Sequence, residues 1–200
     1  MNSHPTRMKK RRRLINIDSV DQGKGYMRNI LAFIGMVAVL VCAGAAAIFF
    51  GGYYDVGTTA WEPPIVRWAL ISVREASVRR HAGSQPTLNL ADPVIIRTGA
   101  RVYLDRGCVN CHGGPGVTWA KFSEGLRPDP ADLKEIALER SPSEIFWVLK
   151  NGINMTGMPG FGAATDQDLW AIVAFVKKMP EVNDDDFKAW SSQAGEVPKP

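Results

Sequence analysis

The longest apolar stretch of the 200-residue chain runs from Asn29 to Tyr54, where no position carries a charged side chain. The stretch is rich in Leu, Ile, Val, Ala, Phe and Gly. About 20 apolar residues in helical conformation cross the hydrocarbon core of a bilayer, and a helix packed in a soluble core normally keeps a polar face. The pattern therefore predicts a transmembrane helix over residues 29–54.

Basic residues are concentrated before this stretch. Residues 1–28 carry eight Lys and Arg against two Asp, whereas residues 93–200 carry twelve Lys and Arg against fourteen Asp and Glu. An excess of Lys and Arg beside a span stays in the cytoplasm. We therefore predict a disordered basic tail over residues 1–28 in the cytoplasm, a span in the bacterial inner membrane, and the rest of the chain in the periplasm. Nucleic-acid binding is not expected, because it needs a basic face on a folded domain.

A cleaved signal peptide is the alternative interpretation of the apolar stretch. Ala43-Gly44-Ala45 and Ala45-Ala46-Ala47 resemble cleavage sites. The apolar run continues beyond these alanines through Ile48-Phe49-Phe50, however. This favours an uncleaved single-pass anchor, with the lipid bilayer as a partner of the chain.

Residues 55–92 form a juxtamembrane segment. Gly57–Pro64 contains Gly, Thr and a Pro pair and is typical of a short exit from the membrane. A helix is predicted over Ile65–His81, with Ile65 and Trp68 on one face and four Arg on another, and a linker follows. Such a helix lies along a membrane surface, docks on a partner subunit or serves as a spacer, and the pattern leaves these alternatives open.

Three segments after residue 92 carry the periodicity and the start signals of helices. They are Val94–Arg106, Pro142–Asn151 and Thr165–Lys178. The second follows Ser141, which forms a capping box with Glu144, and Thr165 and Asp168 have the same spacing in the third. No stretch shows sustained period-two alternation, so the predicted fold class is all-α. Residues 181–200 are expected to form a disordered tail rich in Asp and Pro.

Cys108-Val109-Asn110-Cys111-His112 is a C-x-x-C-H run, the attachment signature of c-type haem. Two thiols at this spacing form thioethers with the vinyl groups on one porphyrin edge, and the adjacent His supplies a nitrogen ligand to the iron. A redox-active Cys pair does not need that His, and a zinc site needs a second ligand pair. The motif therefore predicts one covalently attached haem c.

Two methionines, Met155 and Met158, lie in a Gly-rich loop over residues 151–162, between the last two predicted helices. A buried thioether is a good soft ligand for haem iron, and Met/His ligation raises the reduction potential. Met more commonly fills irregular gaps in a core. Both residues are therefore candidates for a second axial ligand, with core packing as the alternative.

The order of these features resembles a monohaem class I cytochrome c over residues 93–180. The resemblance rests on Gly99-x-x-x-Tyr103, the Cys pair with His112, Met158-Pro159 and an aromatic-bearing last helix. It implies that the first and last helices cross closely at Gly99, with Tyr103 and Trp170 filling the crossing. It selects Met158 as the iron ligand opposite His112, because the family's Met ligand precedes Pro.

The resemblance implies two further roles. A Pro shortly after the motif commonly offers its carbonyl to the ligand His, which indicates Pro115. An Arg in a stretch like Gly125-Leu126-Arg127-Pro128 commonly meets a haem propionate, which indicates Arg127. The predicted site is therefore Cys108, Cys111, Pro115 and Arg127 for the haem, and His112 and Met158 for its iron.

An iron with both axial positions filled has no open site for a substrate, so we predict electron transfer and no enzymatic activity. The predicted function is a membrane-anchored periplasmic cytochrome that carries single electrons to or from a respiratory or photosynthetic membrane complex. The alternative is the electron-accepting cytochrome subunit of a periplasmic dehydrogenase. A gas sensor or peroxidase would need a vacant iron position, which a Met158 ligand would fill.

Overall fold

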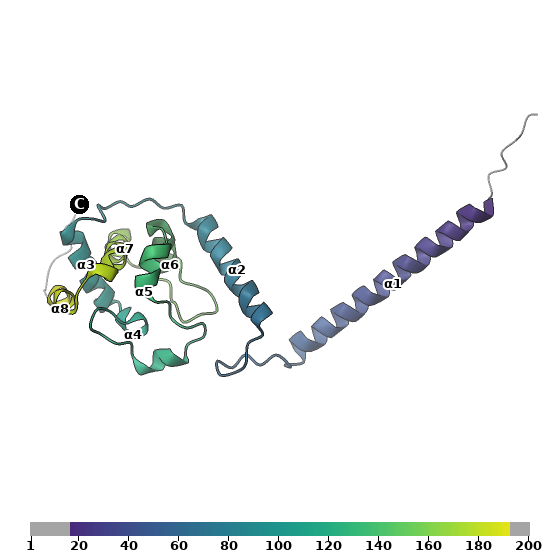
Figure 1. The fold of residues 1–200 in the computed structure, drawn as a ribbon, viewed down its shortest axis with the longest axis horizontal. Coiled ribbons are helices and arrows are strands. Elements are labelled where there is room, and N and C mark those ends of the chain that lie inside the picture. Colours follow the sequence, from purple (N-terminus) through teal and green to yellow (C-terminus); the bar gives the residue numbers. More distant parts are fainter. Residues whose placement is uncertain (1–16, 193–200) are drawn as a thin grey trace, which may run out of the picture. The chain divides into compact units, whose positions relative to one another are not determined.

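The computed structural model describes residues 17–192, and the chain divides into two compact units between Val56 and Gly57 (Figure 1). The first unit contains α1 (Ile17–Phe50). The second, called the haem unit below, contains α2 (Pro64–His81), α3 (Pro93–Asp105), α4 (Val109–His112), the 3-10 helix η1 (Lys121–Gly125), α5 (Leu133–Glu139), α6 (Pro142–Asn151), α7 (Asp166–Lys178), the 3-10 helix η2 (Met179–Glu181) and α8 (Asp184–Ser192). No strand occurs among residues 17–192, which confirms the predicted all-α class.

The N-terminal helix differs in its bounds from the predicted span. Its apolar part, Gly25–Phe50, has 26 residues and is long enough to cross a membrane. At 1.5 Å per residue this is about 39 Å, more than the roughly 30 Å hydrocarbon core requires. The helix begins at Ile17, so residues 17–28 are helical where a disordered tail was predicted, and it ends four residues before Tyr54. Gly52, with φ +68°, follows that end. The basic cluster Met8–Arg13 lies outside the described residues.

The core of the haem unit is the crossing of α3 and α7. Gly99 lies so close to Ala171 that a Cβ built on it would stand 1.9 Å from the Ala171 carbonyl oxygen. Tyr103 and Trp170 are both buried, as the resemblance implied, but they have different ring partners. The ring centroids of Tyr103 and Phe175 of α7 are 5.3 Å apart. Trp170 stacks on Phe146 of α6, with 4.1 Å between ring centroids. The aromatic layer therefore ties α6 to α7 as well as α7 to α3.

Side-chain caps begin several helices where the sequence predicts. Asp92 accepts from Val94 N at the start of α3, and Ser141 and Glu144 form the full capping box of α6. At α7 only half of the predicted box is present. Thr165 accepts from Asp168 N, but the Asp168 carboxylate pairs with Arg106 at 3.4 Å.

The C-terminal segment corrects one prediction. Residues 184–192 form α8, where a disordered tail was predicted, and residues 193–200 lie outside the described part. Phe187 of α8 is fully buried, stacks on Phe175 at 5.4 Å and meets the ring edge of Tyr103 at 6.5 Å. Burial of an aromatic side chain stabilises by about 1.5–3 kcal/mol, which helps to hold this acidic helix on the core.

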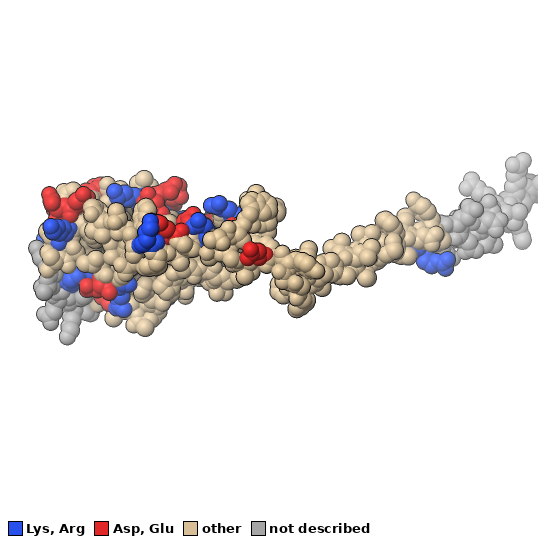
Figure 2. All heavy atoms as spheres, turned by 90° about the horizontal axis from the view of Figure 1, so that it is seen from below, with Lys and Arg blue, Asp and Glu red and all other residues tan. Residues whose placement is uncertain are grey.

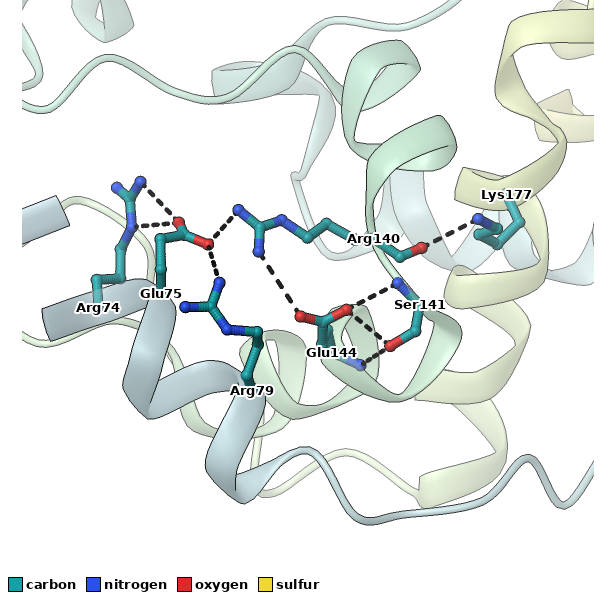
Figure 3. A network of polar contacts seen from close by, with 7 residues as sticks. All are labelled: Arg74, Glu75, Arg79, Arg140, Ser141, Glu144 and Lys177. Carbon is teal, nitrogen blue, oxygen red and sulfur yellow. Dashed lines mark hydrogen bonds and ion pairs between the residues drawn. The ribbon is translucent and has the colours of Figure 1, made fainter. Parts of the chain in front are cut away.

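The juxtamembrane helix α2 belongs to the haem unit and packs against α6. Val78 is buried, and Glu75 of α2 forms an ion pair with Arg140 (Figure 3). Arg140 in turn pairs with Glu144 at 3.6 Å, and its carbonyl accepts from Lys177 of α7 at 3.0 Å. The helix therefore packs on α6, and the choice among the three alternatives left open for it stays a prediction. Acidic and basic side chains are interspersed on the face of the haem unit that Figure 2 shows.

Candidate haem site

Cys111 lies in the single turn of helix α4, and Cys108 is the N-cap residue before it. Gly107, with φ +73°, turns the chain after α3, and Cys108 N donates to the Tyr103 carbonyl at 3.1 Å. His112 N donates to the Cys108 carbonyl at 3.0 Å. Residues three and four apart share a helix face, so Cys111 and His112 lie one turn on from Cys108. The three side chains of the motif are thus presented together, and no described cysteine forms a disulfide.

Cys108, Cys111, His112 and Met158 line one cavity of about 280 Å³ in the haem unit. The rest of the wall is mainly apolar and comes from α5, α6, α7 and the loops between them: Leu126, Leu133, Ile136, Ile145, Leu149, Ile153, Phe161, Ile172 and Val176. Apolar walls suit a flat hydrophobic cofactor and exclude water from the metal that it carries.

The imidazole of His112 is oriented by the backbone. Its Nδ1 lies 2.9 Å from the Ala131 carbonyl oxygen. A carbonyl can only accept, so Nδ1 carries the proton and Nε2 keeps a free lone pair for a metal. Burial lowers the pKa of His112, and the bond to Ala131 opposes this only in part. The net lowering of the His112 pKa favours the neutral ring, and the hydrogen bond to Ala131 selects the tautomer whose Nε2 can bind a metal.

The structure places Ala131 at the position that the resemblance assigned to Pro115. Gly114 and Val117 exchange backbone hydrogen bonds of 2.8 and 3.0 Å, so Pro115 lies at the tip of a tight turn. Pro115 is buried there, and His112 Nδ1 bonds instead to Ala131, in the later segment Pro128–Ala131 that lines the cavity. A backbone acceptor has no side-chain signature, which is why the motif alone could not identify Ala131.

Tyr103 has a role that its helix position did not reveal. Its buried hydroxyl donates to the Gly113 carbonyl at 2.6 Å, directly after the motif. Burial raises the pKa of Tyr103, so the hydroxyl stays a donor. Burial also raises the pKa of the Cys108 thiol to about 11. The α3–α7 crossing therefore holds the end of the attachment turn directly through Tyr103.

The two candidate methionines have opposite environments. Met158 faces the cavity that the Cys pair lines, and its backbone N donates to Thr156 Oγ1 at 3.1 Å. Met155 is 90% exposed and has φ +59°. Phe161 N donates to the Leu149 carbonyl at 2.9 Å, which ties the loop to α6. The described loop therefore brings Met158, and not Met155, to the same cavity as His112.

Arg127 lies outside the wall of this cavity. It is exposed, forms an ion pair with Asp129, and donates to the Leu126 carbonyl at 2.9 Å. It lines a second hollow that Cys111 and His112 also border. Its role toward a haem propionate stays a prediction.

Three residues of α2 also line the cavity, and no sequence pattern indicated them. They are Arg74, Glu75 and Val78. The resemblance to a cytochrome c begins at residue 93, after α2. The helical periodicity of α2 therefore could not show which of its faces lines the cavity. The juxtamembrane helix therefore contributes to the wall of the candidate site.

These residues fit a covalently attached haem. Two thiols one turn apart, an imidazole with a free Nε2 and a thioether line a single apolar cavity. Residues 95–176 match the family model described as cytochrome C oxidase, cbb3-type, subunit III, which covers less than half of the chain. This match supports a monohaem class I c-type cytochrome domain with covalently bound haem c, which indicates an electron carrier. No match was found among curated proteins or solved structures.

Proposed function

We propose that the protein is a membrane-anchored periplasmic cytochrome c that passes single electrons to or from a respiratory or photosynthetic membrane complex. The observation that carries the proposal is the cavity that Cys108, Cys111, His112 and Met158 line together, in a chain whose apolar helix is long enough to span a bilayer. The description of the matching family favours a cytochrome c oxidase as the complex.

In this proposal each cavity residue has one task. Cys108 and Cys111 form the thioethers, His112 Nε2 and the Met158 sulfur bind the iron, and Ala131 keeps the imidazole oriented. The haem supplies a one-electron couple when bound. The apolar wall excludes water and, with a thioether ligand, favours a positive potential. The anchor raises the effective concentration of the haem unit at a partner in the same membrane.

Purification of the full-length, tagged protein from its native membrane tests the partner. We expect cytochrome c oxidase subunits to co-purify, and the ascorbate-reduced cytochrome to be reoxidised when oxygen is admitted. The Cys108→Ser/Cys111→Ser variant, which cannot form the thioethers, should stay in the membrane without this signal. If a dehydrogenase co-purified instead and its substrate reduced the haem, the dehydrogenase alternative would replace the oxidase assignment.

The orientation of the anchor gives a second prediction. Protease added to intact spheroplasts should remove the haem unit and spare a tag fused at Met1, because Lys and Arg are concentrated before the span. Immunoblots against the tag and haem staining of the released fragment would measure both ends. A mature protein whose mass shows that it begins near Ala46 would instead establish a cleaved signal peptide.

A further inference from the structure

The juxtamembrane helix α2 has two faces with different surroundings. On one face Val78 is buried, and Glu75 lies against α6 with its side chain 18% exposed. On the opposite face Ile65, Ala69 and Val73 are exposed, and their spacing of four residues forms a continuous stripe along the helix. One face of α2 therefore packs against the rest of the haem unit, and the opposite face has no partner among the described residues of that unit.

The C-terminal half of α2 is fixed to the haem unit. Glu75 pairs with Arg140 and also with Arg74 and Arg79, at 3.1 and 3.9 Å (Figure 3). His81, at the end of the helix, stacks on the Trp147 ring of α6 with 5.9 Å between ring centroids. A surface that binds the other half of α2 would therefore set the orientation of the haem cavity, whose wall includes Glu75.

The N-terminal half of α2 and the residues just before it expose large apolar side chains. Five of them are between 58% and 78% exposed: Trp61, Ile65, Trp68, Leu70 and Val73. Monomeric soluble proteins rarely expose large contiguous apolar patches, and such patches mark a protein or membrane contact. We call residues 61–73 the apolar segment.

Residue type and chain length favour a lipid surface as the occupant. Within the apolar segment only Glu62 and Arg67 are charged, so its net charge is zero, and the other three Arg of α2 lie after it. Trp is enriched where a protein meets the membrane interface. Only 13 residues separate Phe50 from Pro64, which at full extension reach about 45 Å. The apolar segment therefore remains near the bilayer that α1 would cross.

We propose that the apolar segment lies in the headgroup region of that bilayer as a second membrane contact. The haem unit is then held on the membrane in one orientation, because the Glu75–Arg140 ion pair and the His81–Trp147 stacking fix α2 to the rest of it. This inference rests on the proposed anchoring through α1.

Nitroxide spin labels on the full-length haem protein test the proposal. The labels go on Ile65→Cys and on Val73→Cys, each in a Cys42→Ser background, because Cys108 and Cys111 are consumed by the haem. The protein is reconstituted in vesicles of phosphatidylethanolamine and phosphatidylglycerol and kept reduced, since low-spin ferrous iron is diamagnetic. The measurement compares collisions with oxygen, which concentrates in lipid, against collisions with a water-soluble nickel chelate.

Two matched controls separate the possible failures. A label on Leu138→Cys, which is 79% exposed on α5, reports a water-facing position of the haem unit, and a label on the native Cys42 reports the anchor itself. We expect the oxygen-to-nickel ratio at positions 65 and 73 to exceed that at 138 by several-fold. A ratio equal to that at 138, with Cys42 still in lipid, would overturn this inference and leave the anchor intact.

The remaining outcomes are also decisive. Protection of positions 65 and 73 from both reagents would show that a protein surface covers the segment, which overturns the lipid contact. A water-like ratio at Cys42 would overturn the proposed anchor and this inference together.

Discussion

Replacing Met158 by Ala should abolish the weak sulfur-to-iron band of the oxidised protein in the far red and lower the reduction potential by about 0.2 V. Axial ligands set haem potentials over a range of about 0.8 V, and loss of a thioether removes a ligand that favours the ferrous state. The thioether faces the cavity that also contains His112, so its removal leaves one side of the iron to water or to a foreign ligand. Optical spectra and a redox titration measure both effects.

Met155→Ala is the matched control for this prediction. Met155 is in the same loop but is exposed to solvent, so its variant should keep the band and shift the potential little. Loss of the band in Met155→Ala together with its retention in Met158→Ala would mean that the loop rearranges around the haem and that the ligand is Met155.

The parts of the fold that the sequence predicts depend on local signals. The capping box of Ser141 and Glu144, and Asp92 before Pro93, act within one turn of the helix that they begin, so their effect can be read without knowing the tertiary structure. The attachment turn is similarly local, because helix geometry alone lets two thiols within four residues meet one porphyrin edge while the adjacent imidazole reaches the iron.

The features of the fold that the sequence did not predict depend on contacts between residues that are distant in sequence. Phe187 is the only Phe in an acidic segment. It is buried because its ring packs against Tyr103 and Phe175, which both lie more than ten residues away in sequence. Glu75 meets Arg140, 65 residues later, so its fixing role could not be inferred from α2 alone. In both α8 and α2 the charge and composition of the segment suggest exposure to solvent. Its actual packing depends on a contact with a residue that is distant in sequence.

The site shows the same division between local and long-range information. The residue types at Cys108, Cys111 and His112 specify their chemistry, but the acceptor for His112 Nδ1 is a backbone carbonyl that any residue could supply. Its position depends on the path of the loop after the motif. Pro115 lies in the tight turn at Gly114–Val117, and the later segment that ends at Ala131 brings its carbonyl to the ring.

Gly99→Ala should be the most damaging single-methyl change in the haem unit. The new Cβ would stand 1.9 Å from the Ala171 carbonyl oxygen and 2.9 Å from the Phe175 Cβ, and the oxygen belongs to a helix backbone that cannot move by itself. Helices α3 and α7 must separate to accept it. Overpacking of this kind costs typically 1–3 kcal/mol and occasionally more, and we expect about 3 kcal/mol here, or roughly 10 °C in Tm.

Separation of α3 from α7 should also weaken the haem site, because Tyr103 is on α3 and its hydroxyl holds the Gly113 carbonyl at the end of the attachment turn. Denaturant unfolding of the haem-loaded protein in detergent, followed by Trp fluorescence and by the sulfur-to-iron band, measures the loss of stability and of ligation together. Gly125→Ala is the control, since a Cβ at Gly125 meets no atom within 4 Å and should change stability by less than about 0.5 kcal/mol. Equal stability of the Gly99→Ala variant and the unmodified protein would show that α3 and α7 do not cross in contact at this residue.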